Sequence, residues 1–202
     1  MPSNIAPYDT KHNDVERIKT NIWITYKCRI LAYERISKYN LHSQVLLAVY
    51  TLPIIFISII DLKFQGNDKQ SLITIFFSIS VLVASIFIYS QNFSGRMEKS
   101  KENYIKLQYI HEHINEQTYP DYLKEYHNII SSYDNHKEID YLHFLKQQLE
   151  KGEIEKKHEN FLSKNRNQIS AYQLLYRSTI FTLYLLPTSA IAYIFYTIIS
   201  HK

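Results

Sequence analysis

The sequence is poor in the residues that build most catalytic and cofactor sites. Three glycines in 202 residues make a phosphate-binding loop of glycine backbone hard to build. Cys28 is the single cysteine, which excludes an intramolecular disulfide and a cysteine-cluster metal site. The nine histidines never show the His-x-x-x-His spacing that puts two ligands on one helical face. We therefore expect no enzyme activity, no cofactor and no metal site.

Charged residues are missing from long blocks of the chain. From His42 to Leu62 the only charge is Asp61, and Ser71–Gln91 has none. A helix of about 20 residues is roughly 30 Å long, the thickness of a hydrocarbon core. A charge at mid-span would cost about 2.5–3.5 kcal/mol. Helices in the core of a soluble protein are the alternative, but a chain of this length has little core in which to bury such blocks. The sequence predicts two transmembrane spans, 42–62 and 71–91.

A third apolar block, Ser178–Ser200, also has no charge, but it contains Pro187 and many hydroxylated residues. We predict a third span within 176–202. A helix that lies in the interface, or one packed beside the hairpin, is the alternative.

Basic residues flank the two predicted spans on the same side. Those before the first span are Lys27, Arg29, Arg35 and Lys38, and those after the second are Arg96, Lys99, Lys101 and Lys106. In the 63–70 loop, Lys63 and Lys69 are offset by Asp61 and Asp68. The positive-inside rule then predicts a multi-pass protein of the cytoplasmic membrane, with its N-terminus and central region in the cytoplasm. The first forty residues are polar, so no cleaved leader is expected.

The remaining pattern predicts an all-α fold. Residues 1–13 have few apolar groups and are expected to be disordered. An amphipathic helix from Asp14 runs into the first span, and Gly66 and Asn67 mark a turn between the spans. A second cytosolic helix covers 92–117 and is expected to pack against the first. A cytosolic helical region, 118–175, contains helices near 121–131 and 138–151, the latter ended by Gly152.

Basic residues in the cytosolic segments alternate with glutamates, as in 96–102. This pattern is typical of a solvated helix face, and near a membrane it favours anionic lipid head groups. We expect no direct nucleic-acid binding.

Polar residues inside the predicted spans form two stripes at helical spacing. The first-span stripe is Gln44, Thr51 and Ser58, and the second-span stripe is Ser71, Thr74, Ser78 and Ser85. Such residues allow close helix packing, or they line an aqueous path once several copies assemble. Both explanations stay open. No charge lies deep in a span, which argues against a proton relay or an ion-coupled transporter.

Two sequence runs beside the spans resemble a known family. The run 21–35 (NIWITYKCRILAYER) resembles the opening of the SLATT domain, and the run 91–104 (QNFSGRMEKSKENY) resembles its exit helix. The resemblance covers about 14–117, and it rests on the order of helix, span, short turn, span and basic helix. The residues that carry it are Trp23, Arg29, Arg35, Asn92, Arg96 and Tyr104.

The resemblance implies a two-span effector of bacterial conflict and antiphage systems. Such an effector is thought to oligomerise and form a pore, or perturb the inner membrane, when a partner signals infection, so that the cell dies or stops growing. Implied partners are a nucleotidyltransferase, a nucleotide-sensing domain or a reverse transcriptase. The third apolar block departs from the minimal pattern and suggests a longer branch of the kind found beside reverse transcriptases. Trp23, Arg29, Arg35 and Arg96 would be structural or gating residues near the lipid surface.

A non-conducting membrane anchor or scaffold is the alternative function. It would recruit a soluble partner through a tyrosine-rich face of the cytosolic helices. The tyrosines are Tyr119, Tyr122, Tyr126, Tyr133 and Tyr141. If exposed they would form a docking surface, and if buried they would belong to the core.

Overall fold

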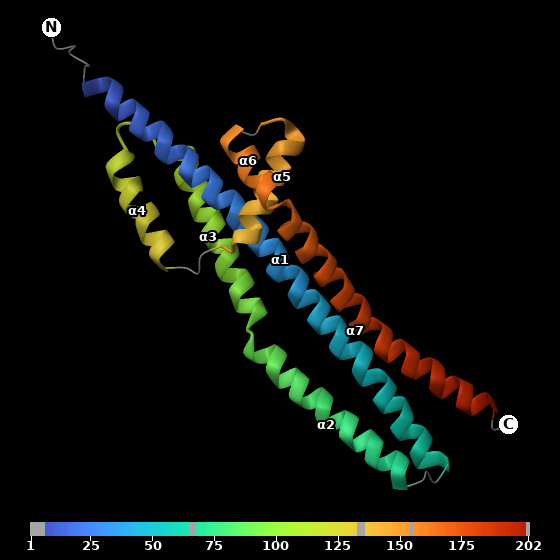
Figure 1. The fold of residues 1–202 in the computed structure, drawn as a ribbon. Coiled ribbons are helices and arrows are strands. Elements are labelled where there is room, and N and C mark those ends of the chain that lie inside the picture. The colour runs from blue at the N-terminus through green and yellow to red at the C-terminus, as the bar shows by residue number, and fades with distance from the viewer. Residues whose placement is uncertain (1–6, 65–67, 133–135, 154–155, 201–202) are drawn as a thin grey trace. The chain divides into compact units, whose positions relative to one another are not determined.

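The computed structural model describes residues 7–64, 68–132, 136–153 and 156–200 (Figure 1). All the regular secondary structure of these ranges is helical, which confirms the predicted all-α class. The helices are α1 (Pro7–Phe64), α2 (Asp68–Ser90), α3 (Phe93–His113), α4 (Tyr119–Ser132), α5 (Glu138–Lys151), α6 (Lys156–Lys164) and α7 (Arg166–Ser200).

Helix α1 begins earlier than the apolar pattern indicates. It starts at Pro7 and not at Asp14, so residues 7–13 are helical where disorder was expected. Proline is favoured in the first turn of a helix, because its fixed φ suits the helix and its missing N–H needs no partner there. Residues 1–6 lie outside the described ranges.

The predicted spans differ from the helices mainly at their ends. Helix α1 reaches Phe64 and α2 starts at Asp68, so both extend into the predicted 63–70 turn, whose Gly66 and Asn67 lie outside the described residues. After α2, the chain turns at Asn92, which has a φ of 45° and donates its N–H to the Tyr89 carbonyl at 3.0 Å. Asparagine is one of the few residues that tolerate this left-handed conformation. This turn separates the second apolar helix from α3.

Helix α5 has the bounds that the sequence predicts. Gly152 takes the left-handed conformation with a φ of 73° and donates its N–H to the Leu149 carbonyl at 3.0 Å, which closes the helix. At the other end, the Asp140 carboxylate accepts the Lys137 backbone N–H at 2.9 Å. Helix α4 covers the predicted 121–131 and starts at Tyr119, because Pro120 fits its first turn.

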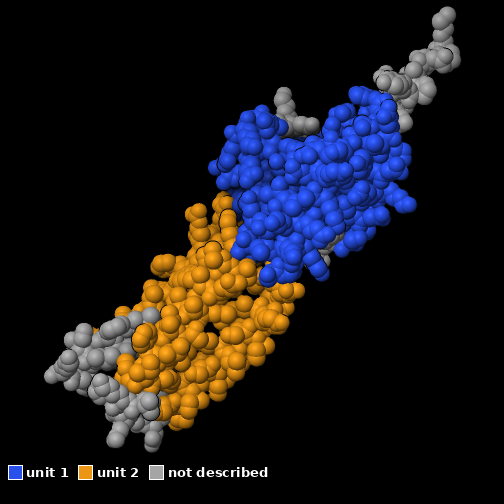
Figure 2. Space-filling model, turned by 180° about the vertical axis from the view of Figure 1, so that it is seen from behind, with its two compact units in different colours: residues 1–37, 94–169 blue, residues 38–93, 170–202 orange. Residues whose placement is uncertain are grey.

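The chain forms two compact units, coloured separately in Figure 2. Unit 1 comprises residues 1–37 and 94–169, and unit 2 comprises residues 38–93 and 170–202. Helix α1 contributes its N-terminal part to unit 1 and its C-terminal part to unit 2.

The core of unit 1 forms where α1 packs against α3 and α4. Ile22 of α1 and Leu107 and Ile110 of α3 are fully buried in one apolar cluster. Two ring pairs, Tyr26–His111 at 5.6 Å and Tyr33–Tyr104 at 5.7 Å, show that α1 and α3 run antiparallel. The predicted packing of the two cytosolic helices is confirmed (Figure 1).

Unit 2 consists of the C-terminal part of α1 with α2 and α7 (Figure 1). Tyr39 and Tyr172 share a hydrogen bond between their hydroxyls, and the His42 ring lies 6.1 Å from that of Tyr184. The later residue of α1 thus contacts the later residue of α7, so the two helices run parallel.

Candidate functional site

Most of the surface of α2 is apolar and exposed. Leu72 is 66% exposed, Phe76 68% and Phe87 65%. Successive helical positions are about 100° apart, so the exposed apolar residues from Leu72 to Phe87 cover more than half of the helix circumference and leave one half-buried face. They are Leu72, Ile73, Ile75, Phe76, Phe77, Ile79, Leu82, Val83, Ile86 and Phe87. Soluble proteins rarely expose a contiguous apolar surface of this extent to water, which indicates that α2 lies in an apolar environment.

Two helical stretches of the described chain are long and apolar enough to cross a membrane. An 18-residue window within each stretch has a mean hydropathy of 2.1 in His12–Ile60, within α1, and of 2.5 in the stretch that starts at Ser71 with α2. The first stretch includes residues 42–60 of the predicted span 42–62, and the second includes the whole predicted span 71–91. Helix α7 is not among them over the described residues, so the predicted third span is not shown.

The first-span stripe lies on the exposed side of α1. Gln44, Thr51 and Ser58 are all exposed within the protomer. The Thr51 hydroxyl donates to the Leu47 carbonyl of its own helix, and the Ser58 hydroxyl donates to the Ile54 carbonyl at 2.8 Å. Gln44 donates to the Asn40 side chain at 3.2 Å. This stripe therefore faces away from the other helices of unit 2.

The second-span stripe lies mostly on the half-buried side of α2. Ser71, Thr74 and Ser85 are half-buried, whereas Ser78 is exposed. Ser78 donates to the Thr74 carbonyl and Ser85 to the Val81 carbonyl, each at 2.8 Å. Hydrogen bonds to the preceding turn satisfy such hydroxyls without a second helix. The structure thus separates the two stripes, one facing outward from unit 2 and one turned mainly into it.

A hydrogen bond joins α1 to α7 at a proline. Pro187 lies inside α7 and has no N–H to give to the Leu183 carbonyl four residues earlier. The Tyr50 hydroxyl of α1 donates to this carbonyl at 3.0 Å. In an apolar environment each backbone polar group needs a partner inside the protein. Tyr50 thus supplies the donor that the proline lacks.

The structure brings three of the family-motif arginines together in unit 1. Arg29, Arg35 and Arg96 line one cavity. Arg29 is 2% exposed and so is buried in the protein, not at a lipid surface. Arg35 binds Asp140 through two hydrogen bonds, Nε–Oδ1 at 2.8 Å and Nη2–Oδ2 at 2.9 Å. Paired forks of this kind are among the strongest charge-assisted contacts in proteins.

The other three family-motif residues form ring contacts or a turn. Trp23 packs edge-on against Phe144 of α5, with ring centroids 5.3 Å apart, and Tyr104 packs against Tyr33. Asn92 forms the turn after α2.

Sequence reasoning missed the partners of the arginines. Asp140 is 105 residues from Arg35 in the chain, and no local pattern relates the two.

Burial and the nearby Arg29 lower the pKa of His136, which lines the same cavity. Burial, and to a lesser extent Asp140, raises the pKa of Cys28 to about 12. The thiol is therefore protonated and shielded at neutral pH.

Two other expectations can be compared with the described residues. They contain no group of three or more His, Cys, Asp or Glu residues placed to hold a metal ion. The tyrosines expected to form a docking face belong largely to the core. Tyr126 is buried, Tyr119 and Tyr122 pack against the unit 1 cluster, and Tyr141 stacks on Phe144. Tyr133 lies outside the described residues.

A comparison with protein-family models identifies one match. The family described as SMODS and SLOG-associating 2TM effector domain family 5 (SLATT_5) matches residues 11–196. Neither a curated protein nor a solved structure matches the chain. The family match spans most of both units and includes the two runs that resemble the SLATT domain, so the chain belongs to SMODS and SLOG-associating 2TM effector domain family 5.

Proposed function

We propose that this protein is an oligomeric effector that permeabilises the bacterial cytoplasmic membrane when a partner signals phage infection. The observation that carries the proposal is the exposed apolar surface over most of α2, in a chain whose family is named for two-span effectors. Loss of the ion gradients would kill the cell or stop its growth. The membrane helices themselves would permeabilise the bilayer, and no catalytic residue is required.

The outward stripe of α1 would line the path for ions. Gln44, Thr51 and Ser58 are exposed in the protomer, so a ring of copies would bring these polar groups around a common axis. The half-buried stripe of α2 would serve helix packing, because small hydroxylated residues allow close approach. The two explanations left open by the sequence would then apply to different helices.

We propose that α7 accompanies the hairpin as a third span. It has 35 residues, which is about 52 Å of helix and longer than the roughly 30 Å of a hydrocarbon core. It runs parallel to α1, and Tyr50 satisfies its Leu183 carbonyl. With the N-terminus and the central region in the cytoplasm, the end of α7 would lie outside.

The family name points to the partners. Association with SMODS and SLOG proteins would supply a nucleotidyltransferase or a nucleotide-sensing domain as the sensor. A reverse transcriptase is a further candidate, from the resemblance to longer SLATT branches. A scaffold that binds its partner through exposed tyrosines is less favoured, because the described tyrosines of that face are at least half-buried.

Membrane potential in cells tests the proposal. The chain is induced with its neighbouring genes under triggering conditions, and a potential-sensitive dye is followed. We expect the wild type to depolarise the cells and T51V/S58A to depolarise them much less, because the pore wall loses its hydroxyls. The matched control is S80A, which removes an exposed hydroxyl outside both stripes, bonded to the Phe76 carbonyl at 2.9 Å.

Intact potential in triggered wild-type cells would contradict permeabilisation. Equal depolarisation by the wild type and T51V/S58A would instead contradict the assignment of the α1 stripe to the ion path. Equal membrane amounts of the variants, measured by immunoblot, are required for the comparison.

A further inference from the structure

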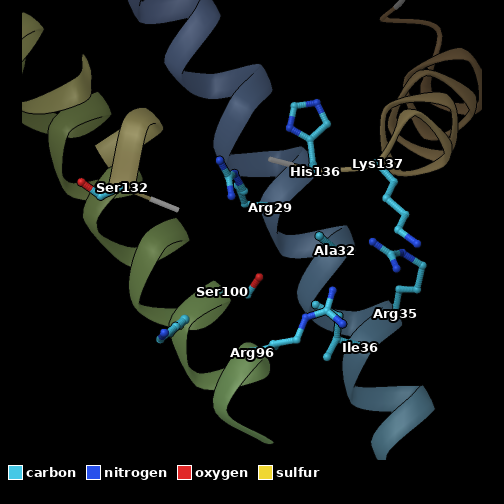
Figure 3. Close-up of a pocket in the computed structure, with 10 residues that line it drawn as sticks. Arg29, Ala32, Arg35, Ile36, Arg96, Ser100, Ser132, His136 and Lys137 are labelled. Carbon is cyan, nitrogen blue, oxygen red and sulfur yellow. The ribbon is translucent and has the colours of Figure 1, made fainter. Parts of the chain in front are cut away.

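Unit 1 contains a cavity of about 150 Å³ that is lined by residues of α1 and α3, by the last residue of α4 and by residues 136–137 (Figure 3). A single water needs about 10–15 Å³ of cavity volume, so the cavity holds several waters or a small ligand group. Its lining residues are Arg29, Ala32, Arg35, Ile36, Arg96, Lys99, Ser100, Ser132, His136 and Lys137.

Five cationic side chains converge on this cavity from three parts of the chain. Arg29 and Arg35 come from α1, Arg96 and Lys99 from α3, and Lys137 immediately precedes α5. No carboxylate is among the described residues that line it. Figure 3 shows Arg35 and Lys137 pointing toward each other and Arg96 reaching from α3 toward α1.

Asp140, which is only 2% exposed, lies beside the cavity and contacts Arg35. Both of its oxygens bond to Arg35, and one also accepts the Lys137 backbone N–H. Asp140 thus offsets part of the positive charge that the described residues bring to the cavity wall. Like charges held together in a partly buried space repel strongly, since the effective dielectric constant there is lower than in water. An anion in the cavity would relieve this repulsion.

We propose that this cavity binds a phosphate group. Guanidinium forks match phosphate oxygens in a bidentate geometry, and lysines add point charge. Ser100 adds a hydroxyl group at the wall. The volume suits one or two phosphate groups, with the rest of the ligand outside. This site goes beyond the proposed membrane function and does not depend on pore formation.

Two sources can present such a group to unit 1. One is a soluble nucleotide, whose terminal phosphates enter the cavity. The other is the head group of an anionic phospholipid. The recognition chemistry is the same for both, so the experiment has one arm for each source.

Calorimetric titration tests the site on the full chain in nanodiscs of neutral lipid, with pyrophosphate and then ATP as probes. We expect saturable binding of pyrophosphate at one site per chain, weakened by added salt. In R96Q/K99Q the affinity should fall at least about tenfold, because the phosphate loses two charge-assisted donors. These two residues lie one helical turn apart on α3, and circular dichroism checks that the variant keeps its helices.

The charge-matched control is K106Q/K146Q, which removes two exposed lysines of the same unit outside the cavity. They pair with Glu102 at 2.6 Å and Glu150 at 4.0 Å within their own helices. Its affinity should stay within about threefold of the wild type, because long-range surface charge is screened. Equal weakening in both double variants would overturn the site, because it would show charge attraction without a cavity.

The lipid arm repeats the titration in nanodiscs that contain phosphatidylglycerol. Competition that is lost in R96Q/K99Q assigns the phosphate to a lipid head group and supports the site. Unchanged pyrophosphate binding assigns it to a soluble ligand and also supports the site. The proposal would be overturned by two results together. Pyrophosphate would not bind in neutral nanodiscs, and any preference for phosphatidylglycerol would be the same in the wild type and R96Q/K99Q.

Discussion

The buried pair of Arg35 and Asp140 offers a sharp test of how unit 1 is held together. The side chains are 14% and 3% exposed, and two hydrogen bonds of 2.8 and 2.9 Å join them. Asp140 also caps the first turn of α5 through the Lys137 N–H. D140N keeps the shape but leaves the Arg35 charge partly buried without its carboxylate. Loss of one partner of such a pair lowers the free energy of unfolding by about 3–5 kcal/mol. The loss in D140N should lie near the lower end, because the amide oxygen of asparagine can still accept a hydrogen bond from Arg35.

Cys28 provides the assay, because it is the only thiol of the chain and is fully buried in α1. A maleimide reaches it only when unit 1 opens, so the labelling rate reports the free energy of opening. A cost of about 3 kcal/mol corresponds to roughly a hundredfold faster labelling in D140N. The measurement uses the full chain in detergent.

The matched control is E150Q, which removes a carboxylate from the same helix. Glu150 is 64% exposed, and its oxygen lies 4.0 Å from Lys146. Exposed pairs of this spacing contribute about 0.3–0.5 kcal/mol, so labelling should accelerate less than about threefold. If D140N also stayed within threefold of the wild type, the reasoning about the buried pair would be refuted.

Two further predictions concern α7 and the basic cavity. Y50F should destabilise the detergent-solubilised chain by about 0.6–1.7 kcal/mol, because the Leu183 carbonyl loses its donor. In a P187A background the new N–H satisfies that carbonyl, so the cost of Y50F should shrink toward zero, and equal costs in both backgrounds would exclude this role of Tyr50. The lowered pKa of His136, caused by burial and Arg29, predicts acid sensitivity of unit 1. As the pH falls below about 6.5, the unfolded histidine takes up a proton that the folded one does not, so stability is lost. Thermal unfolding followed by the fluorescence of the single tryptophan should show this loss, and H136Q should reduce it; an identical pH dependence in H136Q would refute the assignment.

The sequence predicts the helices well because apolar period and charge are local properties. The apolar block at 42–62 lies within α1, the block at 71–91 ends one residue beyond α2, and Gly152 ends α5 as expected. The packing of α1 on α3 follows from two amphipathic faces that leave the hairpin on one side. These features need no information about distant partners.

The contacts that build the sites are not local, and the sequence alone does not predict them. The family resemblance implies structural or gating roles for Arg29 and Arg35 near the lipid surface, but it does not reveal that Arg29 is buried or that Arg35 pairs with a carboxylate 105 residues away. The partner of the Leu183 carbonyl is likewise Tyr50, on another helix. Pro187 was a usable signal that one carbonyl of α7 lacks its helical donor, but it does not identify which residue replaces that donor.

Planar-bilayer recording tests the central claim of membrane permeabilisation most directly. The chain is purified with its partner, inserted into the bilayer and exposed to the partner's trigger. Our account predicts discrete conductance steps with the wild type and smaller or rarer steps with T51V/S58A. A protein that inserts, as shown by flotation with lipid, and still passes no current under triggering conditions would contradict it.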